Sequence, residues 1–99
     1  MNLKERLKRV LMPPKREIKE PTRVMIRNIV SQELTIPYQQ ATLDLNFRAK
    51  SDSEDLYNLQ AEIESNTGIW LKDKEIEGIR TVEGLYQATH RKYREAIAA

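Results

Sequence analysis

Residues 68–85 read GIWLKDKEIEGIRTVEGL, and their pattern predicts how the second half of the chain folds. Gly68 accepts the left-handed conformation that closes a helix, so we expect a helix to end there. Residues 73–79 can form one or two helical turns that pack two isoleucines inward. Thr81 can then accept a backbone amide at the start of a last helix. The second half is therefore expected to hold helical segments joined by short links.

The helix that ends at Gly68 begins in residues 51–55, which read SDSED. Apolar residues at helical spacing predict its buried face: Leu56, Leu59 and Ile63. Ser51 and Glu54 have the spacing of a capping box, in which each side chain accepts the other residue's backbone amide. On this interpretation, Ser53 is only a polar residue in the first turn.

The first long helix is expected upstream, between a cap at Thr22 and a break at Ile36-Pro37. Its apolar stripe consists of Met25, Ile26, Ile29, Val30 and Leu34. From Tyr38 to Lys50 a short alternation of apolar and polar residues resembles a strand, but a lone strand would have no partner. We therefore expect a long loop held on the core by three side chains: Leu43, Leu45 and Phe47. The predicted fold class is all-α, a small bundle of three main helices plus one short helix, with a long first loop.

Charge divides the chain into two parts. Residues 1–23 hold eight Lys/Arg and three Glu, a net charge of +5, whereas residues 24–99 hold nine Lys/Arg and twelve Asp/Glu, a net charge of −3. We predict a basic N-terminal arm over residues 1–21, a short helix followed by a Pro-rich linker, and a helical domain over residues 22–99. The arm either contacts an acidic partner, anionic lipid or nucleic acid, or is a short solvated helix.

Composition argues against several classes of protein. The chain has 99 residues and no cysteine, which excludes disulfides, thiolate metal ligands and thiol nucleophiles. The single histidine, His90, is expected at the surface rather than as a ligand, and Trp70 and Tyr86 are expected in the core. No apolar run approaches the roughly 20 residues that span a bilayer, and the N-terminus is too charged for a secretory signal. We expect a cytoplasmic monomer without a membrane span.

The order and spacing of residues 22–89 resemble an acyl carrier protein, over about two thirds of the chain. That family carries an Asp-Ser-Leu signature at the start of its second helix, where this chain has Asp52-Ser53-Glu54. Further matching residues of that helix are Asp55, Leu59, Ile63 and Glu64. The family's Gly-Ile pair, acidic short helix ending in Ile, and Thr-Val at the last helix are matched by Gly68-Ile69, residues 73–79 and Thr81-Val82.

The resemblance implies that phosphopantetheine is attached to Ser53, beside Asp52 of the signature, and carries acyl or aminoacyl groups as thioesters. The cleft between the helices would then shelter the acyl chain. The protein would be a non-catalytic carrier for fatty-acid, specialised lipid or secondary-metabolite synthesis, and it would need no cysteine, because the thiol belongs to the cofactor. Its partners would be a phosphopantetheinyl transferase and acyl-transferring or synthase enzymes. The acidic residues implied to dock them are Glu54, Asp55, Glu62 and Glu64.

The chain departs from the family's pattern at several positions. Glu54 replaces a leucine, Asn58 replaces a commonly acidic residue, and Thr67 replaces a large apolar one. Residues 48–51 are basic where the family tends to be acidic and to contain glycine. The alternative is an unmodified interaction module that keeps the carrier fold and is tethered to a partner by its basic arm. A third option, a small nucleic-acid-binding protein, has no visible recognition motif, so no nucleic acid is expected as a partner.

Overall fold

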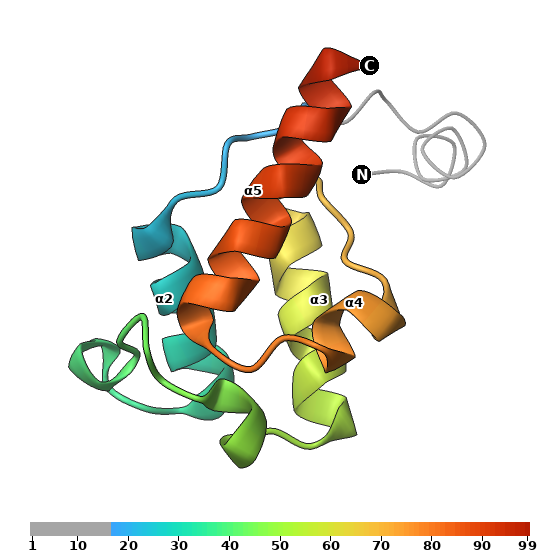
Figure 1. Ribbon diagram of the computed structural model, residues 1–99. Helices are drawn as coiled ribbons and strands as arrows, with labels where there is room; N and C mark the ends of the chain where they lie inside the picture. Colours follow the sequence, from blue (N-terminus) through green and yellow to red (C-terminus); the bar gives the residue numbers. More distant parts are fainter. Residues whose placement is uncertain (1–16) are drawn as a thin grey trace, which may run out of the picture.

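The computed structural model describes residues 17–99, whose helices are drawn in Figure 1. The long helices are α2 (Arg23–Leu34), α3 (Ser53–Thr67) and α5 (Val82–Ala98). The shorter elements are α4 (Asp73–Glu77) and two 3-10 turns, η1 (Tyr38–Gln40) and η2 (Phe47–Lys50). No strand occurs within residues 17–99. The predicted small all-α bundle, with three main helices, one short helix and a long first loop, is confirmed. The predicted helix of the arm lies outside the described residues.

Two of the long helices begin at the threonines that the sequence indicated. Thr22 Oγ1 accepts the Met25 amide at 3.1 Å at the start of α2. Thr81 Oγ1 accepts the Gly84 amide, also at 3.1 Å, at the start of α5. Each bond satisfies one of the amides that lack a partner at a helix start, so both predicted caps are confirmed.

The ends of α2 and α3 both use left-handed residues. Gly68 closes α3 as predicted, with a φ of 78° and its amide donating to the Glu64 carbonyl at 2.7 Å. At the end of α2 the left-handed residue is Thr35, with a φ of 53°. This conformation is uncommon for a β-branched residue. The predicted break at Ile36-Pro37 therefore begins one residue earlier, because Thr35 already reverses the chain.

The connection between α2 and α3 is a loop that is attached to the start of α5. Phe47 is fully buried, and Leu43 and Leu45 pack partly buried against the core, as predicted. The Val82 amide donates to the Leu45 carbonyl at 3.2 Å, and the Glu83 amide donates to the Leu43 carbonyl at 2.9 Å. The loop thus supplies backbone acceptors to the first turn of α5.

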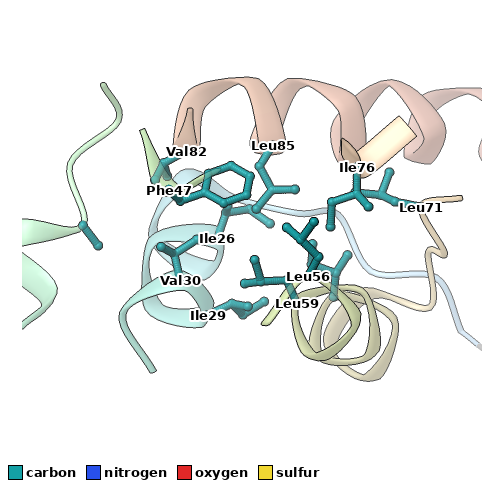
Figure 2. Close-up of a cluster of buried hydrophobic side chains, with 12 residues drawn as sticks. Ile26, Ile29, Val30, Phe47, Leu56, Leu59, Leu71, Ile76, Val82 and Leu85 are labelled. Atoms are coloured by element: carbon teal, nitrogen blue, oxygen red, sulfur yellow. The ribbon is translucent and has the colours of Figure 1, made fainter. Parts of the chain in front are cut away.

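Buried apolar side chains from α2, α3, α4, α5 and the connections meet in one core (Figure 2). Its members are Ile26, Ile29, Val30, Ala41, Phe47, Leu56, Leu59, Ile63, Leu71, Ile76, Val82 and Leu85. Fully burying one large aliphatic side chain stabilises a fold by roughly 1.5–3 kcal/mol. The apolar stripes predicted for the main helices therefore supply the interior, except that Met25 and Leu34 of the first stripe are only partly buried at its margin.

Trp70 is an exception to the predicted core. Its side chain is 40% exposed, whereas its neighbours Ile69 and Leu71 are buried. The link between α3 and α4 is not helical, and in extended backbone successive side chains point to opposite sides. Because the side chains of Ile69 and Leu71 point inward, the side chain of Trp70 between them points outward. Tyr86, also predicted as core, packs partly buried at the core margin.

The residues just before α2 pack along the domain. Pro21 is fully buried, and the Lys19 amide donates to the Thr67 carbonyl at 3.0 Å. His90 Nε2 lies 3.1 Å from a carboxylate oxygen of Glu20. The histidine is half-buried, so it is less exposed than the sequence predicted. Within residues 17–99, none of the helices combines the length and the apolar character that crossing a membrane requires.

Candidate functional site

The start of α3 is capped by Asp52. Its Oδ1 accepts the Asp55 amide at 2.8 Å, and Asp55 Oδ2 accepts the Asp52 amide at 3.1 Å, which forms a capping box. The predicted box of Ser51 and Glu54 is therefore wrong. The Ser51 hydroxyl instead donates to the Phe47 carbonyl at 2.6 Å, at the end of η2. Because the preceding turn holds Ser51, the cap moves one residue along the chain and Glu54 stays exposed.

Ser53 is the first residue of α3, and its side chain is exposed. The Ser53 side chain makes no hydrogen bond or ion pair within residues 17–99. The first amides of a helix have no acceptor in the helix itself, and the box occupies only that of Asp55. The amides of Ser53 and Glu54 therefore remain at the positive end of the helix dipole, where an anion is favoured.

Ser53 also lines an open cleft of about 570 Å³ between η2, α3 and α4. Its apolar lining consists of Leu56 and Ile76. The other lining residues are polar or charged: Arg48, Ser51, Asp52, Ser53, Tyr57, Gln60, Asp73 and Glu77. Arg48 is the one cationic side chain among them. The exposed serine thus adjoins a cleft whose lining is mostly polar, with only two apolar side chains.

Gln60 was not among the residues predicted for the site, yet it fixes one wall of the cleft. It is only 2% exposed. Its Nε2 donates to the Leu71 carbonyl and to Asp73 Oδ1, each at 2.8 Å, which joins α3 to the link before α4 and to the first residue of α4. Gln60 follows Leu56 by one helical turn, so it lies on the buried side of α3. That spacing is the signal that could have identified it.

The four carboxylates predicted to bind partners do not share one face of α3. Asp55 and Glu62 are seven residues apart, which is about two helical turns, so they lie on the same face of α3. Both are half-buried beside α2. Burial, and then the negative charges of Glu62 and Asp55, raise the pKa of Glu33 on α2. Glu54 is exposed elsewhere on the first turn, and Glu64 lines a separate hollow near the end of α3. The four carboxylates therefore lie at three separate places on α3 rather than on one acidic surface.

No group of His, Asp and Glu side chains within residues 17–99 has the arrangement needed to hold a metal ion. Comparisons with protein-family models and with curated proteins find no match for the chain. The candidate site is therefore defined by its own geometry: an exposed serine at a helix start, free amides beside it, and an adjoining cleft.

Proposed function

We propose that the protein is a non-catalytic acyl carrier and that Ser53 is its attachment site for phosphopantetheine. The observation that carries the proposal is the position of the Ser53 hydroxyl, which is exposed and unbonded within residues 17–99 at the first residue of α3. This serine is also the one that corresponds to the Asp-Ser signature of acyl carrier proteins. When bound, the cofactor supplies a thiol that holds an acyl or aminoacyl group as a thioester.

The residues around Ser53 fit a phosphodiester. The amides of Ser53 and Glu54 lie in the first turn of α3, at the attachment point, and Arg48 on the cleft lining adds a positive charge. The neighbouring Asp52 carboxylate is already engaged by the Asp55 amide, which offsets part of its repulsion for an anion. The chain's own contribution is thus to hold and orient the attached group.

The proposed carrier acts as a cytoplasmic monomer that is served by separate enzymes. A phosphopantetheinyl transferase would modify Ser53, and acyl-transferring or synthase enzymes of fatty-acid, lipid or secondary-metabolite synthesis would load and unload it. Glu54 is exposed beside Ser53 and is an accessible contact for a basic patch on such an enzyme. Asp55 and Glu62 are less accessible, because they are half-buried beside α2.

Intact-protein mass spectrometry tests the proposal. The full-length chain is co-expressed with a broad-specificity phosphopantetheinyl transferase and is expected to gain the mass of one phosphopantetheine group. Ser53→Ala should stay at the unmodified mass. Ser51→Ala is the matched control, since its hydroxyl is engaged by the Phe47 carbonyl, and it should still be modified.

A wild-type chain that stays unmodified while a known carrier is converted in parallel would contradict the proposal. The exposed Glu54 carboxylate, in place of the leucine that the family presents to the transferase, would be the residue to examine first. That result would favour the alternative, an unmodified interaction module with a carrier fold.

A further inference from the structure

The side-chain amide of Gln60 has an unused hydrogen-bond acceptor. Both protons of Nε2 are engaged, by the Leu71 carbonyl and by the Asp73 carboxylate. Because both partners can only accept, the orientation of the amide is determined and its carbonyl oxygen is Oε1. Oε1 has no partner within residues 17–99.

This oxygen opens onto the cleft. Within the described residues, no fully buried side-chain nitrogen or oxygen lacks a hydrogen-bond partner, so Oε1 must reach an open surface. Gln60 is 98% buried, and the surface that it lines is the cleft beside Ser53. Because so little of Gln60 is exposed, water reaches Oε1 only from the cleft, and a ligand in the cleft that brings a donor can replace that water.

We propose that the cleft holds the pantetheine arm, with an amide N–H of the arm donated to Gln60 Oε1. This inference rests on the proposed function. Gln60 follows Ser53 by seven residues, which is about 10.5 Å along α3. An arm that leaves Ser53 and follows the cleft first passes Leu56, which can pack against its branched apolar part, and then brings an amide to Gln60.

The same contacts close the interior to the cargo. Gln60 ties α3 to the start of α4, and the side chains behind it, Leu59, Ile63 and Leu71, are fully buried in the core. An acyl chain would have to break these contacts to pass between the helices. The arm therefore lies in the cleft, and the cargo stays at the far end of the arm, outside the helical core. This differs from the resemblance, which implies a cargo sheltered between the helices.

Hydrogen exchange of the arm's own amides tests this assignment. The full-length chain is loaded with ¹⁵N-labelled phosphopantetheine, and exchange of each arm amide is compared with the same amide in free coenzyme A. One arm amide is expected to exchange roughly fivefold more slowly, as a typical hydrogen bond implies. Gln60→Met should remove this protection, whereas Tyr57→Phe, at an exposed residue of the same cleft, should retain it.

The outcomes separate this inference from the proposed function. A chain that cannot be loaded contradicts the function and the inference together. A chain that is loaded but whose arm amides exchange as in free coenzyme A overturns the inference alone, even where Gln60→Met fails to fold. An aminoacyl cargo offers similar donor chemistry to the same acceptor, so acetyl-loaded and aminoacyl-loaded chains are both measured. Protection in both supports the arm as donor, and protection confined to the aminoacyl form overturns it.

Discussion

The starts of α3 and α5 carry similar local signals but differ in what covers them. Each begins at a residue whose side-chain oxygen accepts a backbone amide, Asp52 for α3 and Thr81 for α5, and each has acidic residues in its first turn. At α5 the amides of Val82 and Glu83 donate to carbonyls of the first loop. At α3 the corresponding amides, those of Ser53 and Glu54, donate to no loop carbonyl within residues 17–99.

The comparison shows that a cap decides where a helix begins, while the neighbouring backbone decides whether its remaining amides are free. The loop that covers the start of α5 continues through η2 directly into α3 (Figure 1). Phe47, at the beginning of η2, anchors this segment in the core. The same segment therefore closes one helix start and leaves Ser53 exposed at the other.

Removing the anchor should have the largest effect. Phe47→Ala is expected to cost about 3–5 kcal/mol of unfolding free energy, because it deletes a fully buried ring. The amides of Val82 and Glu83 should also exchange faster, since the loop that accepts them loses its attachment. Urea unfolding and hydrogen exchange measure the two effects.

Tyr57→Ala is the control for this prediction, because Tyr57 is 62% exposed and should change stability by no more than about 0.5 kcal/mol. If Phe47→Ala proves unfolded, Phe47→Leu keeps an apolar side chain and should show the same exchange pattern at smaller cost. Unchanged exchange at Val82 and Glu83 in a folded variant would mean that the loop does not depend on Phe47.

The next effect concerns the caps. Asp52→Ala removes the carboxylate that accepts the Asp55 amide, while the backbone amide of residue 52 can still donate to Asp55, and the expected cost is about 1–2 kcal/mol. Thr81→Ala also removes one cap bond, but its cost should be smaller, about 0.5–1 kcal/mol, because Thr81 carries no negative charge at the positive end of the helix dipole. Glu54→Ala should leave stability within about 0.5 kcal/mol, as expected for an exposed side chain outside the box. A loss for Glu54→Ala as large as that for Asp52→Ala would instead support the capping box of Ser51 and Glu54, which the structure contradicts.

The smallest effect is a difference in the response to acid. The Arg23 guanidinium, 2.7 Å from a carboxylate oxygen of Glu83, lowers the pKa of Glu83 at the start of α5. The stability that the Glu83 carboxylate contributes is therefore present above the ordinary pKa of a glutamate and is lost as the pH falls through the lowered pKa. Beside α3, burial raises the pKa of Glu33. The stability that Glu33 contributes is complete below the ordinary pKa of a glutamate, where the carboxyl group is protonated, and is lost as the pH rises through the raised pKa.

Two variants measure this difference. Glu83→Gln should reduce the loss of stability on acidification, and Glu33→Gln should increase stability at neutral pH and remove the gain at lower pH. Both effects should be small, since the Arg23–Glu83 pair is partly exposed and Glu33 is only half-buried. Urea unfolding from neutral pH to about pH 3 covers the range in which carboxylates titrate. Parallel pH profiles for the two variants would show that the carboxylates of Glu83 and Glu33 do not differ in this way.

Much of the fold could be predicted because its signals are local. The caps at Thr22 and Thr81 and the closure at Gly68 depend on residues within a few positions of each other. The buried faces follow from helical spacing alone. The loop attachment by Phe47 was also predictable, since an apolar side chain in a loop with no strand partner must bury itself on the helices.

The candidate site was less predictable. Ser53 was identified through its resemblance to a carrier signature, but its cleft depends on the position of α4 relative to α3. Gln60 was missed because its importance comes from acceptors more than ten residues away, at Leu71 and Asp73. The spacing from Leu56 places Gln60 on the buried side of α3, but no local pattern indicates which acceptors its amide reaches.

By itself, the sequence determined the class of fold, the order of the helices and most of their ends, because apolar spacing and capping act over one or two turns. Only the tertiary structure decided that Asp52 rather than Ser51 caps α3 and that Trp70 points outward. It also decided that the start of α5 is covered while that of α3 is open. In each case the deciding partner is backbone or core from another element, and its position exists only once the chain has folded.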